Sequence, residues 1–142
     1  MDKRTFAILF ALLLATAGII AYIYSRPVLS TPIIKLACAD LTQGCGNQLI
    51  TLKVDKPPQI MRPFQLTVEM PQAKEMHVSF AMRNMDIGFN RYRLIKQADG
   101  WHAEVTLPVC SQSRSDWMML AEAETAEGLV RYQLPFQATH DN

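Results

Sequence analysis

The apolar run from Thr5 to Tyr24 constrains this chain more than any other feature, because none of its residues is charged. A helix of about 20 residues rises about 30 Å, which matches the hydrocarbon core of a bilayer. Tyr22 and Tyr24, at the end of the run, suit the membrane interface, where aromatic side chains gather. The sequence therefore predicts one membrane-spanning helix, which anchors the chain within residues 1–25.

A cleavable signal peptide is the alternative interpretation of this segment. The start MDKR is basic, and Ala15-Thr16-Ala17 has the small-x-small form of a cleavage site. The apolar run continues past Ala17 to Tyr24, however, whereas the apolar part of a signal peptide is about 7–15 residues long. The length of the run therefore favours an uncleaved anchor.

The basic residues that flank the run do not decide its orientation, since Lys3 and Arg4 lie at one end and Arg26 and Lys35 at the other. We expect the very short N-terminal tail to stay in the cytoplasm, as it does in a signal anchor. This orientation predicts a single-pass protein of the inner (cytoplasmic) membrane whose C-terminal domain lies in the periplasm. Disulfides persist on that oxidising side.

Size and charge limit what the rest of the chain can do. About 115 residues follow the predicted anchor, enough for one domain with a single core. The net charge of +1 argues against the concentrated basic face of a nucleic-acid-binding protein, and the cluster Arg83, Arg91 and Arg93 is typical of a solvated face. The sequence has no G-x-S-x-G or H-E-x-x-H motif, so we do not expect an enzyme.

The chain divides into four predicted parts. Residues 1–25 are the anchor, and residues 26–46 are expected to be a tether with two cysteines, because SRPVLSTP is rich in proline and serine and has no helical period. Residues 47–138 are expected to form a periplasmic sandwich domain. Residues 139–142 are polar and are expected to be a disordered tail.

Apolar and polar residues alternate with period 2 through the predicted domain. The alternation recurs in seven segments, which are Leu49–Val54, Phe64–Met70, Met76–Met82, Asn90–Ile95, Trp101–Leu107, Trp117–Glu124 and Val130–Phe136. Turn signals such as Pro57-Pro58 and Asp99-Gly100 separate the segments. This pattern predicts an all-β fold, an immunoglobulin-like β-sandwich of about seven strands. A small open barrel is the alternative fold.

Soft metal ligands gather along and just after the third predicted strand, where Met76, His77, Met82 and Met85 lie within ten residues. Thioether sulfur and imidazole nitrogen suit Cu(I). Alternation places Met76 and Met82 on the apolar face, where methionine fills core space, so His77 and Met85 are the freer ligands. We therefore name Met85, His77 and Met82 as the candidate metal-binding residues and copper as the candidate cofactor.

The three cysteines allow more than one arrangement. Cys38 and Cys45 can close a short loop, or either of them can pair with Cys110. A redox or metal thiol site is the third alternative. The expected compartment favours a structural disulfide, but the spacing does not choose its partners.

One short motif points to a known family. Residues 82–88 read M-x-x-M-D-x-G between two predicted strands, and Gly100-Trp101 forms a turn before a further strand. This arrangement, over about residues 59–136 and behind an anchor, resembles the YtkA-like and FixH-like group of membrane-anchored extracytoplasmic domains. The resemblance implies a role in copper handling and in the assembly of respiratory cytochrome oxidases. It places Met85 at the family's turn methionine, with Met82 just upstream.

These observations lead to two expected functions. The first is a membrane-anchored periplasmic accessory protein that handles copper or assists assembly of a respiratory copper enzyme, with a membrane protein as its client. The alternative is a metal-free protein-interaction module of the inner membrane, held together by a disulfide. A thiol-redox enzyme is a distant third, because nothing near Cys110 except Arg114 favours a reactive thiolate.

Overall fold

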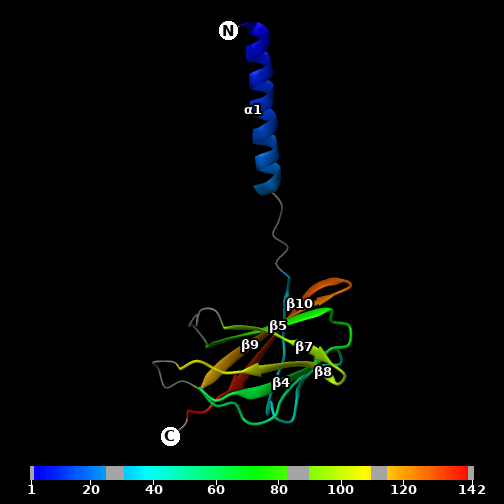
Figure 1. Ribbon diagram of the computed structural model, residues 1–142, viewed down its shortest axis with the longest axis vertical. Coiled ribbons are helices and arrows are strands. Elements are labelled where there is room, and N and C mark those ends of the chain that lie inside the picture. Colours follow the sequence, from blue (N-terminus) through cyan, green and yellow to red (C-terminus); the bar gives the residue numbers. More distant parts are fainter. Residues whose placement is uncertain (1, 25–30, 83–89, 110–114, 141–142) are drawn as a thin grey trace. The chain divides into compact units, whose positions relative to one another are not determined.

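The chain forms two separate units in the computed structural model. The residues that the structure describes are 2–24, 31–82, 90–109 and 115–140. The first unit is Met1–Ser30 and the second is Thr31–Asn142. Within the described residues, the first unit contains one helix and the second contains all of the strands (Figure 1).

The first unit contains α1 (Lys3–Tyr24), a helix of 22 residues. Its apolar residues surround the helix instead of forming one stripe, which is typical of a helix in an apolar environment. Thr16, a polar residue within the run, donates its hydroxyl proton to the carbonyl of Leu13 over 2.9 Å, so the group is satisfied without water. The helix is long and apolar enough to cross a membrane, as the sequence predicts.

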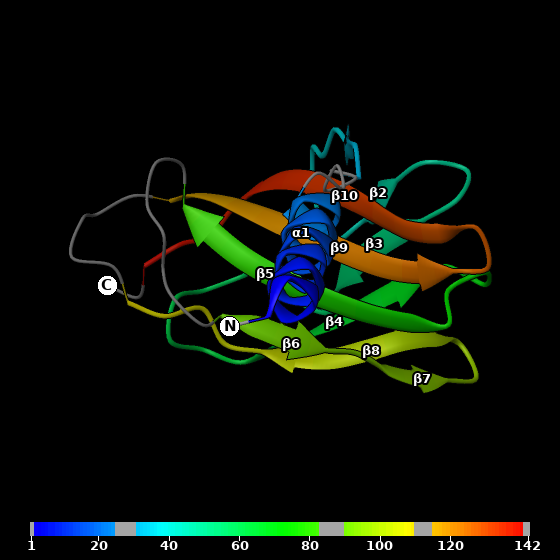
Figure 2. The same ribbon diagram turned by 90° about the horizontal axis from the view of Figure 1, so that it is seen from above.

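The second unit is a sandwich of two five-stranded sheets. The first sheet has the order β1 (Ile33–Lys35), β10 (Gly128–Gln137), β9 (Asp116–Thr125), β5 (Glu75–Met82) and β6 (Arg91–Arg93). The second sheet has the order β2 (Cys45–Gly46), β3 (Thr51–Val54), β4 (Phe64–Glu69), β8 (Gly100–Val105) and β7 (Ile95–Gln97). Figure 2 shows β10, β9 and β5 side by side. All strand pairs are antiparallel except β1 with β10. The predicted β-sandwich is confirmed.

The period-2 alternation explains why these segments become strands with one buried face. Burial alternates residue by residue through β4, β5 and β9, because successive side chains of a strand point to opposite faces. The buried side chains of β5 are those predicted from the sequence, namely Met76, Val78, Phe80 and Met82. Every such strand contributes its apolar side chains to one core between the sheets.

Aromatic side chains form much of this core. Among the residues that the structure describes, Trp117, Tyr132 and Phe64 are the largest fully buried side chains. Phe80 lies edge-on to Tyr92 and to Phe136, with ring centroids 6.0 Å apart in each pair. Edge-to-face pairs stabilise a core by about 0.5–1.5 kcal/mol beyond the burial of their area. The core therefore holds β5, β6 and β10 in register at one end of the first sheet.

The turn predicted at Asp99-Gly100 is confirmed, and it requires glycine. Gly100 has a φ of +140°, where residues with a side chain are strained. A Cβ at this position would also lie 2.9 Å from the carbonyl oxygen of Val68. Glycine therefore lets the start of β8 lie close against β4.

The segment predicted as one strand at Asn90–Ile95 is divided between the sheets. Its first part is β6 in the first sheet, and its end begins β7 in the second. Leu94, between them, is buried, and its N–H donates to the carbonyl of Met76 over 3.0 Å. The chain thus changes sheets at Leu94, a step that alternation alone does not reveal.

The predicted tether at 26–46 is wrong for residues 31–46, which belong to the sandwich. Ile33–Lys35 forms β1, which pairs with β10, and the N–H of Leu36 donates to the carbonyl of Gln133 over 2.8 Å. Cys45–Gly46 forms β2. Strands of two or three residues are too short to show a period in the sequence. The proline and serine residues of this segment therefore indicated a tether instead.

The predicted disordered tail at 139–142 is likewise wrong at its first residue. Thr139 forms a parallel bridge with Gln59. Its N–H donates to the carbonyl of Pro58 over 3.1 Å, and its own carbonyl accepts from Ile60 over 3.0 Å. Main-chain hydrogen bonds of this kind do not depend on side-chain polarity, which is why a polar sequence misled the prediction. Residues 141–142 lie outside the described residues.

Candidate functional site

The structure separates two of the three residues predicted to bind metal. His77 and Met82 both lie on β5, but their positions differ by an odd number of residues, so their side chains leave opposite faces of the strand. Met82 is in the core and is 3% exposed, whereas His77 faces outward and contacts Glu75. Met85 lies outside the described residues.

These positions do not fit a shared copper site. A ligand pair must place both donor atoms within bonding distance of one ion, and the sheet itself stands between the thioether of Met82 and the imidazole of His77. Within residues 2–24, 31–82, 90–109 and 115–140, no group of three or more His, Cys, Asp or Glu side chains could hold a metal ion. We therefore derive no chemistry through copper at this strand.

Of the predicted cysteine pairings, the structure contains the one with the smallest separation in sequence. Cys38 and Cys45 form a disulfide with a Cα–Cα distance of 5.2 Å. The alternatives that pair either residue with Cys110, or that use them as free thiols, are therefore wrong, because a sulfur atom forms one disulfide. Cys110 itself lies outside the described residues.

The loop that the disulfide closes is ordered by its own side chains. Asp40 accepts from the N–H of Thr42 over 2.9 Å and from its hydroxyl over 2.7 Å, and these bonds lower the pKa of Asp40. In the chain-entropy account, a loop of this size removes about 2.5 kcal/mol of unfolded-state entropy. The disulfide therefore stabilises the junction between β1 and β2, in the segment that the sequence alone marked as a tether.

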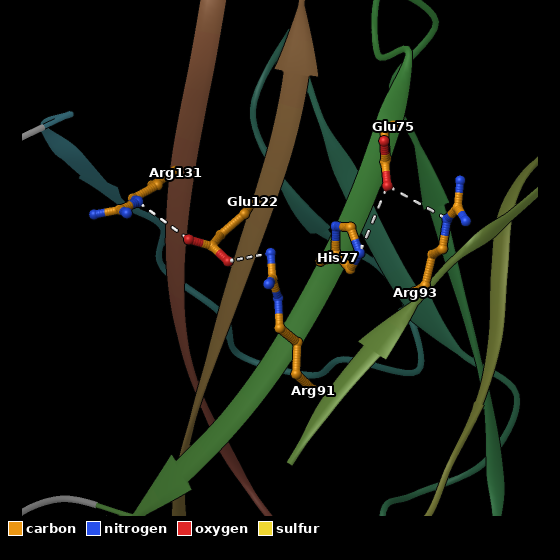
Figure 3. A network of polar contacts seen from close by, with 6 residues as sticks. All are labelled: Glu75, His77, Arg91, Arg93, Glu122 and Arg131. Atoms are coloured by element: carbon orange, nitrogen blue, oxygen red, sulfur yellow. Dashed lines mark ion pairs between the residues drawn. The ribbon is translucent and has the colours of Figure 1, made fainter. Parts of the chain in front are cut away.

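A charged network on the outer face of the first sheet surrounds His77 (Figure 3). Its members are Glu75, His77, Arg91, Arg93, Glu122 and Arg131, from the four strands β5, β6, β9 and β10. Cross-strand register explains why they meet. Arg131 lies opposite Glu122, Glu122 opposite His77, and His77 opposite Arg93. Residues in register on neighbouring strands project from the same face, so the four strands align Arg131, Glu122, His77 and Arg93 in one row. Glu75 and Arg91 lie in the rows on either side of it.

Glu122 is at the centre of the first half of this network. Its Oε2 lies 3.1 Å from Nη2 of Arg91, and its Oε1 lies 3.2 Å from Nε of Arg131. Arg91 comes from β6, so it reaches across β5 to meet Glu122 on β9 (Figure 3). Ser79, directly opposite Arg91 on β5, is small enough for the long side chain to pass. One carboxylate is thus shared by two guanidinium groups.

Glu75 is at the centre of the second half. Its Oε1 lies 3.4 Å from Nε of Arg93 and 3.7 Å from Nε2 of His77. His77 therefore already has a carboxylate partner, and it is in direct register with Glu122 on its other side. The outward position of His77 on the sheet is therefore explained by its place in this charge network.

Half-buried apolar side chains continue the same face beyond the charged network. Two residues along each strand, the next row holds Leu120 with Ser79 and Gln133 and ends in Arg91 and Lys35, and the row after it holds Ala81, Met118 and Pro135. The apolar side chains of these two rows are partly exposed, except Pro135, which is exposed. The outer face of the first sheet therefore combines a charged row with a half-buried apolar area.

A second polar cluster lies on the outer face of the second sheet. The hydroxyl of Thr67 is 3.3 Å from Nδ1 of His102, and Nε2 of His102 is 2.8 Å from Oδ1 of Asp99. The order hydroxyl, imidazole, carboxylate resembles a catalytic triad in composition. The carboxylate is 72% exposed, however, so water screens it, whereas the carboxylate of a catalytic triad is buried. The cluster fastens the turn between β7 and β8 onto β4.

The pKa of Asp99 tests this role of the cluster. The hydrogen bond from His102 lowers the pKa of Asp99 below its usual value, with a smaller contribution from the N–H of Asp99 itself. A carboxylate with a lowered pKa stabilises the fold above its unfolded-state pKa, and this contribution is lost as the pH falls through the folded-state value, below about pH 4. In His102→Ala, an NMR titration should show the pKa of Asp99 rising towards the usual value. An unchanged pKa would contradict the hydrogen bond.

A hollow of about 350 Å³ lies between the turn after β4 and the turn between β7 and β8. Trp101 lines it, but the Nζ of Lys96 lies 5.5 Å from the centre of the indole ring. This cation–π contact occupies the ring face that would attract a positively charged ligand. The indole N–H donates to the carbonyl of Met70 over 3.4 Å. The hollow is therefore best explained by packing of the two turns.

Sequence reasoning missed most of the charged network. The sequence predicts a solvated face for Arg91 and Arg93, and both side chains are exposed in the structure, whereas Arg83 lies outside the described residues. Glu122 and Arg131 gave no signal, because each is an ordinary polar residue in an alternating strand. Their meeting depends on the register between β9 and β10.

Comparisons with known proteins add little to this picture. No family model matches the sequence, and no curated protein matches it. A crystal structure of an engineered protein is similar over 62% of this chain and 20% of its own, with 17% sequence identity and a TM-score of 0.46. A likeness at this level carries no argument about fold or function.

Proposed function

We propose that this chain is a membrane-anchored interaction module, which docks a membrane protein client through the outer face of the first sheet. The observation that carries the proposal is the composition of that face, where a charged row across four strands adjoins half-buried apolar side chains. Such a face can bury apolar area at its centre and select its partner by charge at its edge. In this proposal the domain needs no metal.

We also propose that the domain lies in the periplasm, with α1 in the inner membrane. The support is the Cys38–Cys45 disulfide, since disulfides persist in oxidising compartments and are rare in the cytoplasm. The length and apolar character of α1 support the membrane location. Alkaline phosphatase fused after Asn142 should be active in intact cells under this proposal, and an inactive, stable fusion would contradict it.

The copper-handling alternative has less support among the described residues. It would rest on Met85 with ligands other than Met82, because Met82 and His77 face opposite sides of β5. The resemblance to the YtkA-like and FixH-like group stays a prediction. We therefore place the interaction module first.

Site-directed photo-crosslinking in membranes of the native cells tests the proposed function. We expect the full chain with p-benzoylphenylalanine at Leu120 or Gln133, on the outer face of the first sheet, to crosslink to one defined protein. The matched control carries the same probe at Thr67, on the outer face of the second sheet. The crosslink at Gln133 should disappear when Leu120 is changed to Arg. Equal crosslinking from both faces, or no crosslink from the first, would contradict the proposal.

A further inference from the structure

We infer that the partner segment that occupies this face is an extended strand of a protein, which places one carboxylate beside Arg91 and Arg131 and an apolar side chain against Leu120. This inference rests on the proposed function and names the chemistry of the partner. Three arguments support it. They are the local charge balance, the spacing of the two rows of side chains on the sheet, and the mixed charge of the face, which does not suit a nucleic acid or a lipid surface.

The local charge balance around Glu122 favours an anion. Arg91 and Arg131 share this single carboxylate, at 3.1 and 3.2 Å, so one positive charge has no counter-charge within the group of three. Each guanidinium carries five N–H donors, and the side chain of Arg91 is 55% exposed. A carboxylate from a partner can therefore accept paired hydrogen bonds there, the geometry in which arginine binds carboxylates most strongly.

The same contacts hold the arginines in place before a partner arrives. The side chain of Glu122 is only 16% exposed, and it contacts one arginine on each side. Immobilising a long side chain costs about 0.5–1.5 kcal/mol when a complex forms. Because Glu122 already restrains Arg91 and Arg131, this cost is reduced.

The spacing of the rows predicts the pattern of the partner. Glu122 and Leu120 are two residues apart on β9 and point to the same face, which places them about 7 Å apart along the strand. An extended partner segment has the same spacing between alternate side chains. An acidic residue that meets the guanidinium of Arg91 beside Glu122 therefore places the side chain two residues away against Leu120, which adjoins Met118 on the same face. The expected pattern is acidic, any residue, apolar.

The charge of the whole face argues against a nucleic acid or a lipid surface. It carries four basic side chains, Lys35, Arg91, Arg93 and Arg131, and four acidic ones, Glu75, Asp116, Glu122 and Glu124. Binding to anionic lipid surfaces relies on clusters of about 4–8 lysine or arginine residues, and here the carboxylates cancel that field. A single carboxylate that meets the arginine pair avoids this repulsion, so a protein segment fits better than a polyanion.

Binding of short peptides to the full chain in lipid nanodiscs tests the inference. The probes are acetylated, amidated Thr-Asp-Thr-Leu-Thr and the matched peptide Thr-Lys-Thr-Leu-Thr, with methyl NMR of Leu120 and Met118 as the readout. The acidic peptide at millimolar concentration should shift both methyl signals, and the lysine peptide should not. In Arg91→Gln the dissociation constant should rise about tenfold or more, since a charge-assisted pair is lost.

Two controls make the outcomes distinct. Lys53→Gln removes one exposed positive charge from β3 in the second sheet and should leave peptide binding unchanged. Equal shifts with both peptides, no shift with either, or unchanged binding in Arg91→Gln would overturn the inference. The methyl signals are also compared, without peptide, between nanodiscs of neutral and of anionic lipid. A shift between the two would overturn the inference, because it would show that the bilayer itself occupies the face. Face-specific crosslinking without peptide binding would leave the proposed function standing and refute only this partner chemistry.

Discussion

Replacing Trp117 with alanine should destabilise the sandwich by about 3–5 kcal/mol, the usual cost of removing a large aromatic side chain from a core. Trp117 is 1% exposed. It lies on β9 in register with Met82 on β5 and Phe136 on β10, so its ring packs among three central strands. Because domains unfold with about 5–15 kcal/mol, the loss is a large part of the total. Urea unfolding of the full chain in detergent micelles, followed by near-UV circular dichroism, measures it.

Trp117→Phe is the matched control for this substitution. The indole N–H of Trp117 is buried and has no hydrogen-bond partner among the residues that the structure describes, and a buried unpaired donor costs about 1–3 kcal/mol. Phenylalanine keeps an aromatic ring and removes this donor, so the loss of stability should be much smaller than with alanine. Equal losses from the two variants would show that the ring does not pack as described.

Replacing Met82 with alanine should cost about 2–5 kcal/mol, whereas Met82→Leu should cost less than about 1.5 kcal/mol. Met82 is 3% exposed, so alanine leaves a cavity, and leucine nearly conserves the volume. Both substitutions remove the thioether sulfur. The pair therefore separates a packing role, which leucine preserves, from a ligand role, which leucine abolishes. Urea unfolding of the two full-length variants measures the difference.

A Cu(I) titration against a competing chelator completes this test. We expect any Cu(I) affinity of the full chain to be the same in Met82→Leu as in the wild type, because the sulfur lies in the core and faces away from His77. A fall of tenfold or more in Met82→Leu would show that the sulfur binds copper. It would also reopen the metal-handling function.

Several features of the fold could be predicted from the sequence because they depend on neighbours along the chain. The period-2 alternation gave the inward face of β5 correctly, including Met76 and Met82. The Asp99-Gly100 turn and the apolar helix were also local signals. By contrast, β1 and β2 were missed because they contain only three and two residues and owe their order to pairing with other strands.

The residues of the candidate site divide in the same way, into features that depend on sequence neighbours and features that depend on contacts between distant strands. The odd spacing of His77 and Met82 already placed them on opposite faces, and the structure shows what each face contacts. The choice of Cys45 over Cys110 as the partner of Cys38 could not be read from spacing, because several pairings were open to the chain. The ion pairs of Glu122 join residues from β6, β9 and β10, which are far apart in sequence.

The sequence by itself determined the apolar helix, the all-β class and the side of each long strand that faces the core. These properties follow from the order of apolar and polar residues, because a helix or a strand presents its side chains with a constant period. Only the tertiary structure decided the strand order, the disulfide pairing and the charged network on the outer face of the first sheet. Those depend on register between distant strands, where many residues together choose one alignment and no single residue indicates it.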